Sequence, residues 1–328
     1  MENKILKLLK DNKDSYISGQ DISNELGVSR TAIWKHITKL KEMGYEINSI
    51  SKKGYKLVES PDLLTYEEIK PYLCTKLIGR KILHFDTITS TNSKAKEIAD
   101  FSENNGAVII SEEQTNGRGR LGRTWVSPKY KGLWMSVILK PELNPMEAAK
   151  LTQIGAAAVA KSLKELNINA LIKWPNDVVL NSKKVCGILT EMNAELTKIN
   201  YVIMGIGINV NIEENDFPVE LRDIASSLYI EHGKLINRQE LTAKILNNFE
   251  TLYFEFVNKG NIKESIDICR NFSALLNKEI NVIKNQQVTP AVAKDLDAEG
   301  RLLVEYLDGN TEWLISGEVS IRGKNGYV

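Results

Sequence analysis

The chain has 328 residues, of which 42% are hydrophobic and 26% are charged, as in ordinary globular proteins of two or three domains. Its formal net charge of +1 gives no overall basic field, so any contact with nucleic acid must come from a local surface. The N-terminal segment carries charges where a signal peptide would be apolar, and the most apolar later run, residues 201–210, is too short to span a bilayer. We therefore expect a cytoplasmic protein with no membrane partner.

The first part of the chain predicts three short helices. Residues 2–11 have the hydrophobic spacing of a helix, and a second helix is expected between a capping Ser18 and a terminating Gly27. Ser29 is placed to cap a third helix, which Gly44 would end. A tight turn before the third helix is the arrangement of a helix-turn-helix.

Two runs with the spacing of strands follow, residues 45–50 and 54–59, and they flank a basic tip. Three helices and this hairpin predict a winged helix-turn-helix domain. Residues 29–56 contain seven lysines and arginines but only two glutamates, and this local net charge of +5 is typical of a surface that contacts phosphates. The alternative is a solvated basic helix and hairpin without a DNA partner. The candidate DNA-binding residues are Ser29, Arg30, Thr31, Lys35, Lys52 and Lys53.

Beyond a linker at Pro61, strands and helices alternate irregularly. Strands are expected at 82–88, 107–113, 124–127, 133–140, 170–174, 178–180, 186–192 and 201–210, with a long helix at 145–166 and further helices at 237–272. Several connections are too short for a crossover helix, so the sheet should be mixed or antiparallel. The tail after Glu279 predicts a small β-barrel. The expected fold class is therefore α+β, with domains at 1–60, 64–271 and 272–328.

The cysteines and histidines suggest no metal site. Cys74, Cys186 and Cys269 lie far apart and outside any C-x-x-C motif, and we interpret all three as reduced, packed thiols. The three histidines are equally scattered, so none is expected to act as a metal ligand or catalytic base.

A glycine- and arginine-rich segment, GRGRLGRTW at 117–125, contains the pattern G-x-G-x-x-G. The pattern is typical of dinucleotide binding only where it opens a helix, but here β-type residues and Pro128 follow it. Arg118, Arg120 and Arg123 instead present planar forks that match carboxylate or phosphate oxygens, on a backbone that glycines allow to close tightly. We expect this loop to be mobile until an anionic ligand binds. The alternative is a basic surface loop.

Two polar or glycine-containing segments could share the ligand of that loop. Residues 90–92 (Ser-Thr-Asn) lie between a strand and a helix, where they could cap the helix or bind a polar headgroup, and Gln114 is within reach. Residues 205–209 (GIGIN) place two glycines in an apolar strand, which indicates close approach of a ligand or another backbone.

A third segment, KWPND at 173–177, turns the chain at its proline before a hairpin. A two-residue hairpin loop would place Lys184 opposite Val179, with Asp177 on the same face one diagonal away. The carboxylate would then orient an ammonium toward the ligand. The alternative is a surface ion pair of little energetic value.

Taken in order, the N-terminal helix-turn-helix, TSTN, GRGRLGRTW, KWPND, KVCGIL and GIGIN resemble the biotin protein ligases that double as biotin operon repressors. The resemblance covers nearly the whole chain. It implies a winged-helix DNA-binding domain, a catalytic domain similar to class II aminoacyl-tRNA synthetases and a C-terminal SH3-like barrel. It also implies an activity: biotin and MgATP give biotinyl-5′-AMP, and the biotinyl group then passes to a lysine of a biotin carboxyl carrier domain.

The same resemblance implies roles for individual residues. The biotin-binding residues would be Ser90, Thr91, Asn92, Gln114, Arg118, Gly119, Arg120, Lys184 and Trp134. The nucleotide-binding residues would be Arg120, Arg123, Trp125, Asn209 and Arg322, the last within a terminal GEVSIR motif at 317–322. The catalytic residues would be Arg118, Arg120, Asp177 and Lys184, with biotin, ATP and Mg²⁺ as the small molecules and no resident metal. Residues 213–228 should cover the adenine, with Phe217 as a candidate.

The resemblance also implies partners and leaves alternatives open. A homodimer that forms when biotinyl-5′-AMP is bound would bind operator DNA of biotin genes. The alternatives are a lipoate-type ligase, a DNA-binding biotin sensor without ligase activity, and a ligase whose N-terminal domain no longer binds DNA. The position at 121 is Leu where several relatives have Arg, which we expect to be tolerated.

Overall fold

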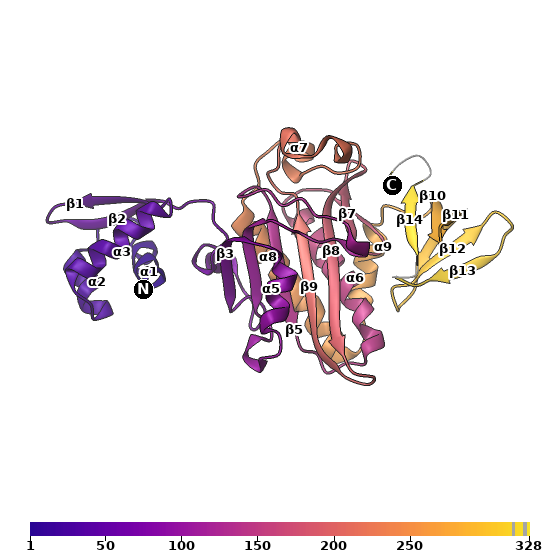
Figure 1. The fold of residues 1–328 in the computed structure, drawn as a ribbon, viewed down its shortest axis with the longest axis horizontal. Helices are drawn as coiled ribbons and strands as arrows, with labels where there is room; N and C mark the ends of the chain where they lie inside the picture. The colour runs from indigo at the N-terminus through magenta and orange to yellow at the C-terminus, as the bar shows by residue number, and fades with distance from the viewer. Residues whose placement is uncertain (317–318, 324–326) are drawn as a thin grey trace. The chain divides into compact units, whose positions relative to one another are not determined.

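The computed structural model describes residues 1–316, 319–323 and 327–328, and divides the chain into two compact units (Figure 1). Unit 1 is Met1–Pro71 and unit 2 is Tyr72–Val328. The two-unit division leaves the predicted bounds of the three domains as predictions. Within the described residues, no helix combines the length and apolar character that a membrane span needs.

Unit 1 contains the predicted helices and hairpin. Ser18 caps the second helix by accepting a hydrogen bond from the Asp21 amide at 3.0 Å, and Gly27 ends it with a left-handed φ of 67°. Ser29 caps the third helix, which ends two residues before Gly44. The elements are α1 (Glu2–Asp11), α2 (Gly19–Leu26), α3 (Arg30–Glu42), β1 (Glu46–Ile50), β2 (Gly54–Glu59) and the short α4 (Tyr66–Ile69).

Unit 2 is built on a seven-stranded mixed sheet, as the short connections predicted. Its strand order is β3-β4-β5-β9-β8-β7-β6, in which only β3 and β4 pair in parallel. The strands are β3 (Ile82–Ile88), β4 (Val108–Gln114), β5 (Leu133–Leu139), β6 (Leu171–Lys173), β7 (Asp177–Leu180), β8 (Lys183–Ala194) and β9 (Ile199–Ile208). The helices are α5 (Thr91–Ile98), α6 (Ala148–Glu165), α7 (Leu228–His232), α8 (Arg238–Lys259) and α9 (Lys263–Asn271).

The strand predicted at 124–127 was wrong. The Trp125 amide donates to the Gly117 carbonyl at 2.9 Å, so this segment closes the glycine–arginine loop instead of joining the sheet. Its β-type composition reflects this local pairing rather than a place in the sheet.

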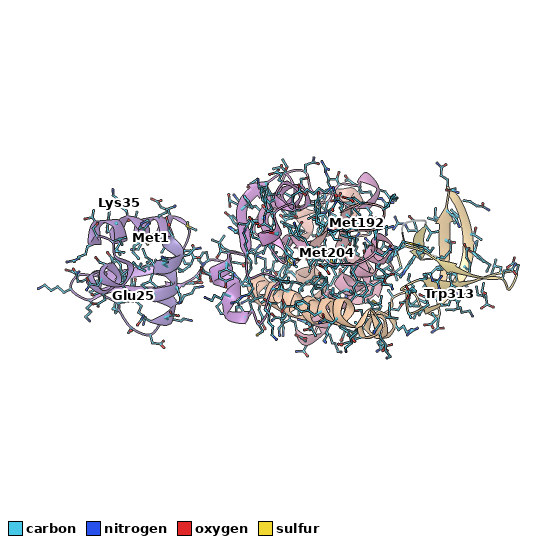
Figure 2. All side chains as sticks on the ribbon, turned by 90° about the horizontal axis from the view of Figure 1, so that it is seen from below. Met1, Glu25, Lys35, Met192, Met204 and Trp313 are labelled. Carbon is cyan, nitrogen blue, oxygen red and sulfur yellow. The ribbon has the colours of Figure 1, made fainter. Side chains whose placement is uncertain are left out.

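The two faces of β9 carry different partners. Met204 faces α6, where Gly155 leaves room for its sulfur, and Ile203 packs in an apolar cluster with Ala95 of α5. Figure 1 shows α5 in front of the sheet and α8 behind it, and Figure 2 shows Met204 in the interior of unit 2. Gly205 therefore lies on the α5 face, which is the face that carries the site described below.

A buried ion pair anchors α8 to the sheet. Arg238 is fully buried, and its guanidinium donates to Glu112 Oε2 at 2.9 Å and to the Gly132 carbonyl at 2.8 Å. The other oxygen of Glu112 lies 2.8 Å from His84 Nε2. No local pattern indicates this pairing, because its members lie 126 residues apart in the chain. The prediction of three packed thiols holds for Cys186 and Cys269 but is wrong for Cys74, which is exposed.

The C-terminal part forms a five-stranded antiparallel sheet of order β13-β12-β11-β10-β14. Its described strands give β13 and β14 as edges, so the sheet is confirmed but a closed barrel is not. Trp174 Nε1 donates to the Gly300 carbonyl at 2.9 Å and joins this sheet to the KWPND turn. Gly317 and Glu318 of the predicted terminal motif lie outside the described residues. The strands are β10 (Glu279–Lys284), β11 (Gln287–Leu296), β12 (Leu302–Tyr306), β13 (Thr311–Leu314) and β14 (Ser320–Gly323).

Candidate active site

A pocket of about 220 Å³ in unit 2 brings together every residue that the sequence singled out for biotin or nucleotide. Segments far apart in the chain line it: the start of α5, the glycine–arginine loop, the KWPND turn, β8, β9 and the terminal strand β14. Asp177 is the only carboxylate among the described residues that line it, whereas arginines and lysines are numerous. The pocket therefore suits an anionic ligand.

One end of the pocket is a buried polar network at the start of α5. Ser90 caps the helix, as one interpretation of the sequence allowed, which leaves Thr91 and Asn92 free to face inward. Gln114 Oε1 accepts hydrogen bonds from the Thr91 amide at 2.8 Å and from its hydroxyl at 3.1 Å. Ser136 Oγ lies 2.8 Å from Thr91 Oγ1 and 2.6 Å from Asn92 Oδ1. Such a network offers fixed donors and acceptors to a polar ring.

The glycine–arginine loop folds over the pocket as a small hairpin. Gly119 N donates to Arg123 O at 2.7 Å, and Leu121 at its tip has a left-handed φ of 57°. Arg120 points inward and donates to Asn176 Oδ1 at 2.7 Å, while Arg118 and Arg123 are exposed. Burial lowers the pKa of the Arg120 guanidinium, and the nearby Asp177 opposes this effect. The predicted mobility of the loop without ligand stays a prediction.

The KWPND turn and the hairpin after it create the predicted carboxylate–ammonium pair. Lys184 pairs with Val179 across β7 and β8, and its Nζ lies 2.6 Å from Asp177 Oδ1 and 5.2 Å from the centre of the Trp125 ring. Lys184 is thus fixed between a carboxylate and an indole face at the pocket surface.

Glycines in β8 and β9 make room for side chains of the site. A Cβ on Gly205 would lie 2.3 Å from Asn92 Oδ1, and one on Gly207 would lie 2.7 Å from Trp125 Nε1. The close approach that the two glycines indicated is therefore made, in this structure, by side chains rather than by another backbone.

Two tryptophans form the apolar wall. Trp125 and Trp134 pack edge to face with ring centres 6.4 Å apart, and Phe217 packs with Trp134 in the same cluster. The indole N–H groups of both tryptophans are buried and have no hydrogen-bond partner among the described residues. Buried donors without partners are uncommon in proteins, and a bound polar ligand would satisfy them.

The opposite end of the pocket is basic and lies beside β14. Lys173 is almost fully buried, and its ammonium lies 3.4 Å from the centre of the Tyr327 ring, which Arg322 also approaches at 5.1 Å. Burial, together with the nearby Arg322, lowers the pKa of Lys173 to about 7. This end of the pocket combines several cations and would bind phosphate groups.

Comparison with known proteins identifies the family. Residues 84–209 match the Biotin/lipoate A/B protein ligase family, residues 2–56 an HTH domain and residues 275–322 the Biotin protein ligase C terminal domain. The bifunctional ligase/repressor BirA of Bacillus subtilis is 42% identical over 257 residues, which cover 78% of this chain and 79% of that protein. This chain belongs to the biotin protein ligase family.

Other family members agree with that assignment. The bifunctional ligase/repressor BirA of Escherichia coli is 28% identical over 324 residues, 97% of this chain and 96% of that protein. The structure of the biotin protein ligase from Aquifex aeolicus in complex with biotin and ATP superposes with a TM-score of 0.65 at 30% identity. The superposition covers 75% of this chain and all of that one.

The surface of unit 1 carries the six residues predicted to contact DNA, and all six are exposed. Figure 2 shows Lys35 at the surface of this unit. Lys39 adds less to the positive surface of unit 1 than its charge suggested, because its Nζ lies 2.7 Å from Glu2 Oε1. This contact is the main reason that the pKa of the Glu2 carboxyl is lowered to about 2. Trp34, which sequence reasoning overlooked, is 59% exposed on α3 and lines a hollow with Arg30 and Lys52.

Sequence reasoning missed three residues that line the ligase pocket, and Ser136, which holds lining residues in place. Ser136 and Asn176 hold Asn92 and Arg120 in place, and Lys173 and Tyr327 form the basic end. Asn176 and Lys173 belong to the KWPND motif, so the motif could have identified both as residues of the site. Ser136 could have been found as a polar residue in an otherwise apolar strand, whereas nothing in the sequence singled out Tyr327.

Proposed function

We propose that this protein is an ATP-dependent biotin ligase that also represses biotin genes. The observation that carries the ligase proposal is that Arg118, Arg120 and Lys184 line the same pocket as the buried polar network at the start of α5. In the first reaction, biotin and ATP give biotinyl-5′-AMP and pyrophosphate. In the second, the biotinyl group passes to a lysine of a biotin carboxyl carrier domain.

The polar network at the start of α5 would bind the ureido ring of biotin. Asn92 offers both an acceptor and a donor there, and its Nδ2 already donates to Glu191 Oε2 at 2.8 Å. Thr91, Ser136 and Gln114 form a linked chain of hydroxyl and amide groups, so each donor direction is fixed before biotin binds. Trp134 would pack against the apolar part of the ligand.

The first reaction joins two anions, so its barrier is largely electrostatic. Biotin's carboxylate must approach the α-phosphate of ATP, and Arg118, Arg120 and Lys184 would lower their mutual repulsion. Lys184 is held by Asp177 and by the Trp125 ring, so its ammonium needs no reorganisation when charge develops. We propose that Gly119 lets the loop backbone approach this junction closely.

The nucleotide would occupy the end of the pocket between Trp125 and β14. Asn209, the residue after β9, is buried, and its Nδ2 donates to the Ser226 carbonyl at 2.8 Å, within the segment proposed to cover the adenine. Phe217 belongs to that segment and packs with Trp134. Arg123 and Arg322 would contact phosphate oxygens.

Mg²⁺ would enter with ATP as part of the substrate. Among the described residues, no group of three or more acidic, histidine or cysteine side chains could hold a resident metal. Mg²⁺ usually binds through one or two carboxylates together with substrate phosphates. Asp177, the carboxylate that lines the described pocket, is already engaged by Lys184 and Tyr327, so the substrate phosphates would supply most of the ligands of Mg²⁺, whose charge would offset theirs.

The second reaction needs no nucleophile from the enzyme. The carrier's lysine amine attacks the carbonyl of the mixed anhydride, the C–O bond to AMP breaks, and AMP leaves with the electron pair. This agrees with the buried state of Cys186, the cysteine that lies beside the pocket-lining Gly187.

The repressor proposal rests on unit 1 and on the family. The exposed N-terminal end of α3 and the basic hairpin tip would contact operator DNA. We propose that biotinyl-5′-AMP, retained when no unmodified carrier is present, favours a homodimer that contacts two half-sites.

The ligase proposal is tested by transfer to a carrier. The full chain is incubated with biotin, ATP, Mg²⁺ and a purified biotin carboxyl carrier domain, and the carrier's mass is measured. We expect one biotinyl group on the wild-type carrier and none on a carrier whose acceptor lysine is replaced by arginine. Modification of a lipoyl domain with lipoate instead would favour the lipoate-type ligase. No transfer with either acid would favour the DNA-binding biotin sensor.

A further inference from the structure

Tyr327, which follows the last described strand, reaches into the ligase pocket. Its hydroxyl donates a hydrogen bond to Asp177 Oδ2, 150 residues earlier in the chain. Its ring lies over the ammonium of Lys173, at 3.4 Å from the ring centre, and against the guanidinium of Arg322. One side chain from the C-terminal part thus touches both the carboxylate and two cations of the site.

Tyr327 provides the hydrogen bond that orients Asp177. The other carboxylate oxygen, Oδ1, lies 2.6 Å from Lys184 Nζ, but this ion pair lacks the alignment of a hydrogen bond. Burial and the neighbouring Asp177 raise the pKa of Tyr327, so the phenol stays protonated and remains a donor at neutral pH. The rotation of the carboxylate toward Lys184 therefore depends on the Tyr327 hydroxyl.

Gly323 lies against residues 327 and 328, the end of the chain that carries Tyr327. A Cβ on Gly323 would lie 2.2 Å from the Val328 carbonyl carbon, and the Gly323 amide donates to the Tyr327 carbonyl at 3.4 Å. The φ of Gly323 is not in the left-handed region, so alanine fits its backbone conformation. The obstacle to a side chain there is the backbone of Val328, the residue after Tyr327.

We propose that Tyr327 is a positioning residue for adenylate formation, which holds the Asp177 carboxylate against Lys184 through its hydroxyl. The inference rests on the proposed ligase function. It predicts that the C-terminal part contributes to the chemical step, since the orientation of Lys184 affects the transition state more than the binding of biotin. A tyrosine that only anchored the chain end, or one that obstructed ATP, would behave differently.

The test compares Tyr327→Phe with Tyr306→Phe, which removes a hydroxyl that bonds to Glu312 in the same C-terminal sheet. The readout is biotin-dependent exchange of labelled pyrophosphate into ATP, with thermal unfolding as the check on folding. We expect Tyr327→Phe to lower kcat about tenfold or more, the range for loss of a hydrogen bond to a charged group, with KM for biotin nearly unchanged. Tyr306→Phe should leave kcat unchanged.

A second variant tests the same contact by another route. Gly323→Ala should displace residues 327 and 328 and lower kcat to a similar degree, and the double variant Gly323→Ala/Tyr327→Phe should lose no more than either alone. An unchanged or raised kcat in Tyr327→Phe would overturn the inference. So would an equal loss in Tyr306→Phe, or losses that multiply in the double variant. If the wild-type chain catalysed no exchange, the proposed function itself would fail, and this inference with it.

Discussion

At the scale of single residues, Lys184 is the group whose removal should be most informative. Its ammonium is fixed 2.6 Å from Asp177 Oδ1 and faces the pocket. We expect Lys184→Ala to lower the rate of adenylate formation by about 10²–10³-fold, as for other preorganised groups aimed at developing charge. Binding of biotin alone should weaken less. Lys198→Ala, which removes an exposed lysine in the turn before β9, is the control. A rate close to wild type in Lys184→Ala would remove this residue from the proposed junction.

Lys173 should make the use of ATP depend on pH. Because burial and Arg322 lower its pKa to about 7, its charge is present below pH 7 and is lost as the pH rises through that value. An uncharged amine attracts phosphate less, so we expect KM for ATP to rise between about pH 6 and pH 8. Lys173→Arg keeps the charge throughout and should abolish the rise. A wild-type KM that does not change with pH in this range would contradict the assignment of Lys173 to the phosphate end.

The lowered pKa of Lys173 also means that its protonated form destabilises the folded state, whereas a lysine in an ion pair stabilises it. In the unfolded chain Lys173 is protonated at any pH below the ordinary lysine pKa of 10.5. In the folded chain it is protonated only below about pH 7. Burial of the charged ammonium therefore lowers the free energy of unfolding by its full amount below about pH 7, and not at all above pH 10.5. Tyr327 offsets part of that cost, because its ring faces the ammonium.

At the scale of secondary-structure elements, β9 supports both ends of the pocket. Gly205→Ala would place a Cβ 2.3 Å from Asn92 Oδ1, whereas Gly207→Ala would place one 2.7 Å from Trp125 Nε1. We expect Gly205→Ala to raise mainly KM for biotin and Gly207→Ala to raise mainly KM for ATP, as measured by pyrophosphate exchange. Equal effects of both variants on both constants would show that the two ends are not separate.

Sequence reasoning located most elements because their ends carry local signals. Ser18, Ser29 and Gly27 cap helices as predicted, and the two-residue turn at Asn181 and Ser182, both with positive φ, places Lys184 opposite Val179. The prediction of a strand at 124–127 failed because this segment pairs with the glycine–arginine loop and not with the sheet. A β-type composition does not specify which partner a segment pairs with.

At the scale of the whole molecule, unit 1 should make the contacts to DNA, and dimer formation should set their strength. One winged helix contacts few phosphates, so a single copy should bind weakly, and two copies on a dimer should gain affinity by effective concentration. We expect Arg30→Ala/Lys35→Ala to abolish binding to a biotin-operon fragment, in the presence of biotin and ATP, while biotin transfer continues. Lys4→Ala/Lys7→Ala removes equal charge from exposed positions of α1 and should retain binding. Wild-type protein that fails to bind such DNA would refute the repressor proposal and leave the ligase intact.

Contacts between distant parts of the chain were beyond sequence reasoning. The motifs predicted the contents of the pocket, but the Arg238–Glu112 pair and the Tyr327–Asp177 bond join residues 126 and 150 positions apart. Neither pair has a periodic or local signature. The predicted closure of the C-terminal sheet likewise depends on pairing between its edge strands, which spacing along the chain does not determine.

The exchange of labelled pyrophosphate into ATP tests the ligase proposal most directly, because it reports adenylate formation without a carrier or DNA. The wild-type chain with Mg²⁺ should catalyse exchange that requires biotin, and lipoate should not replace biotin. Arg118→Ala should lower that exchange by orders of magnitude. Exchange that is absent with biotin, or equally rapid with lipoate, would contradict the account.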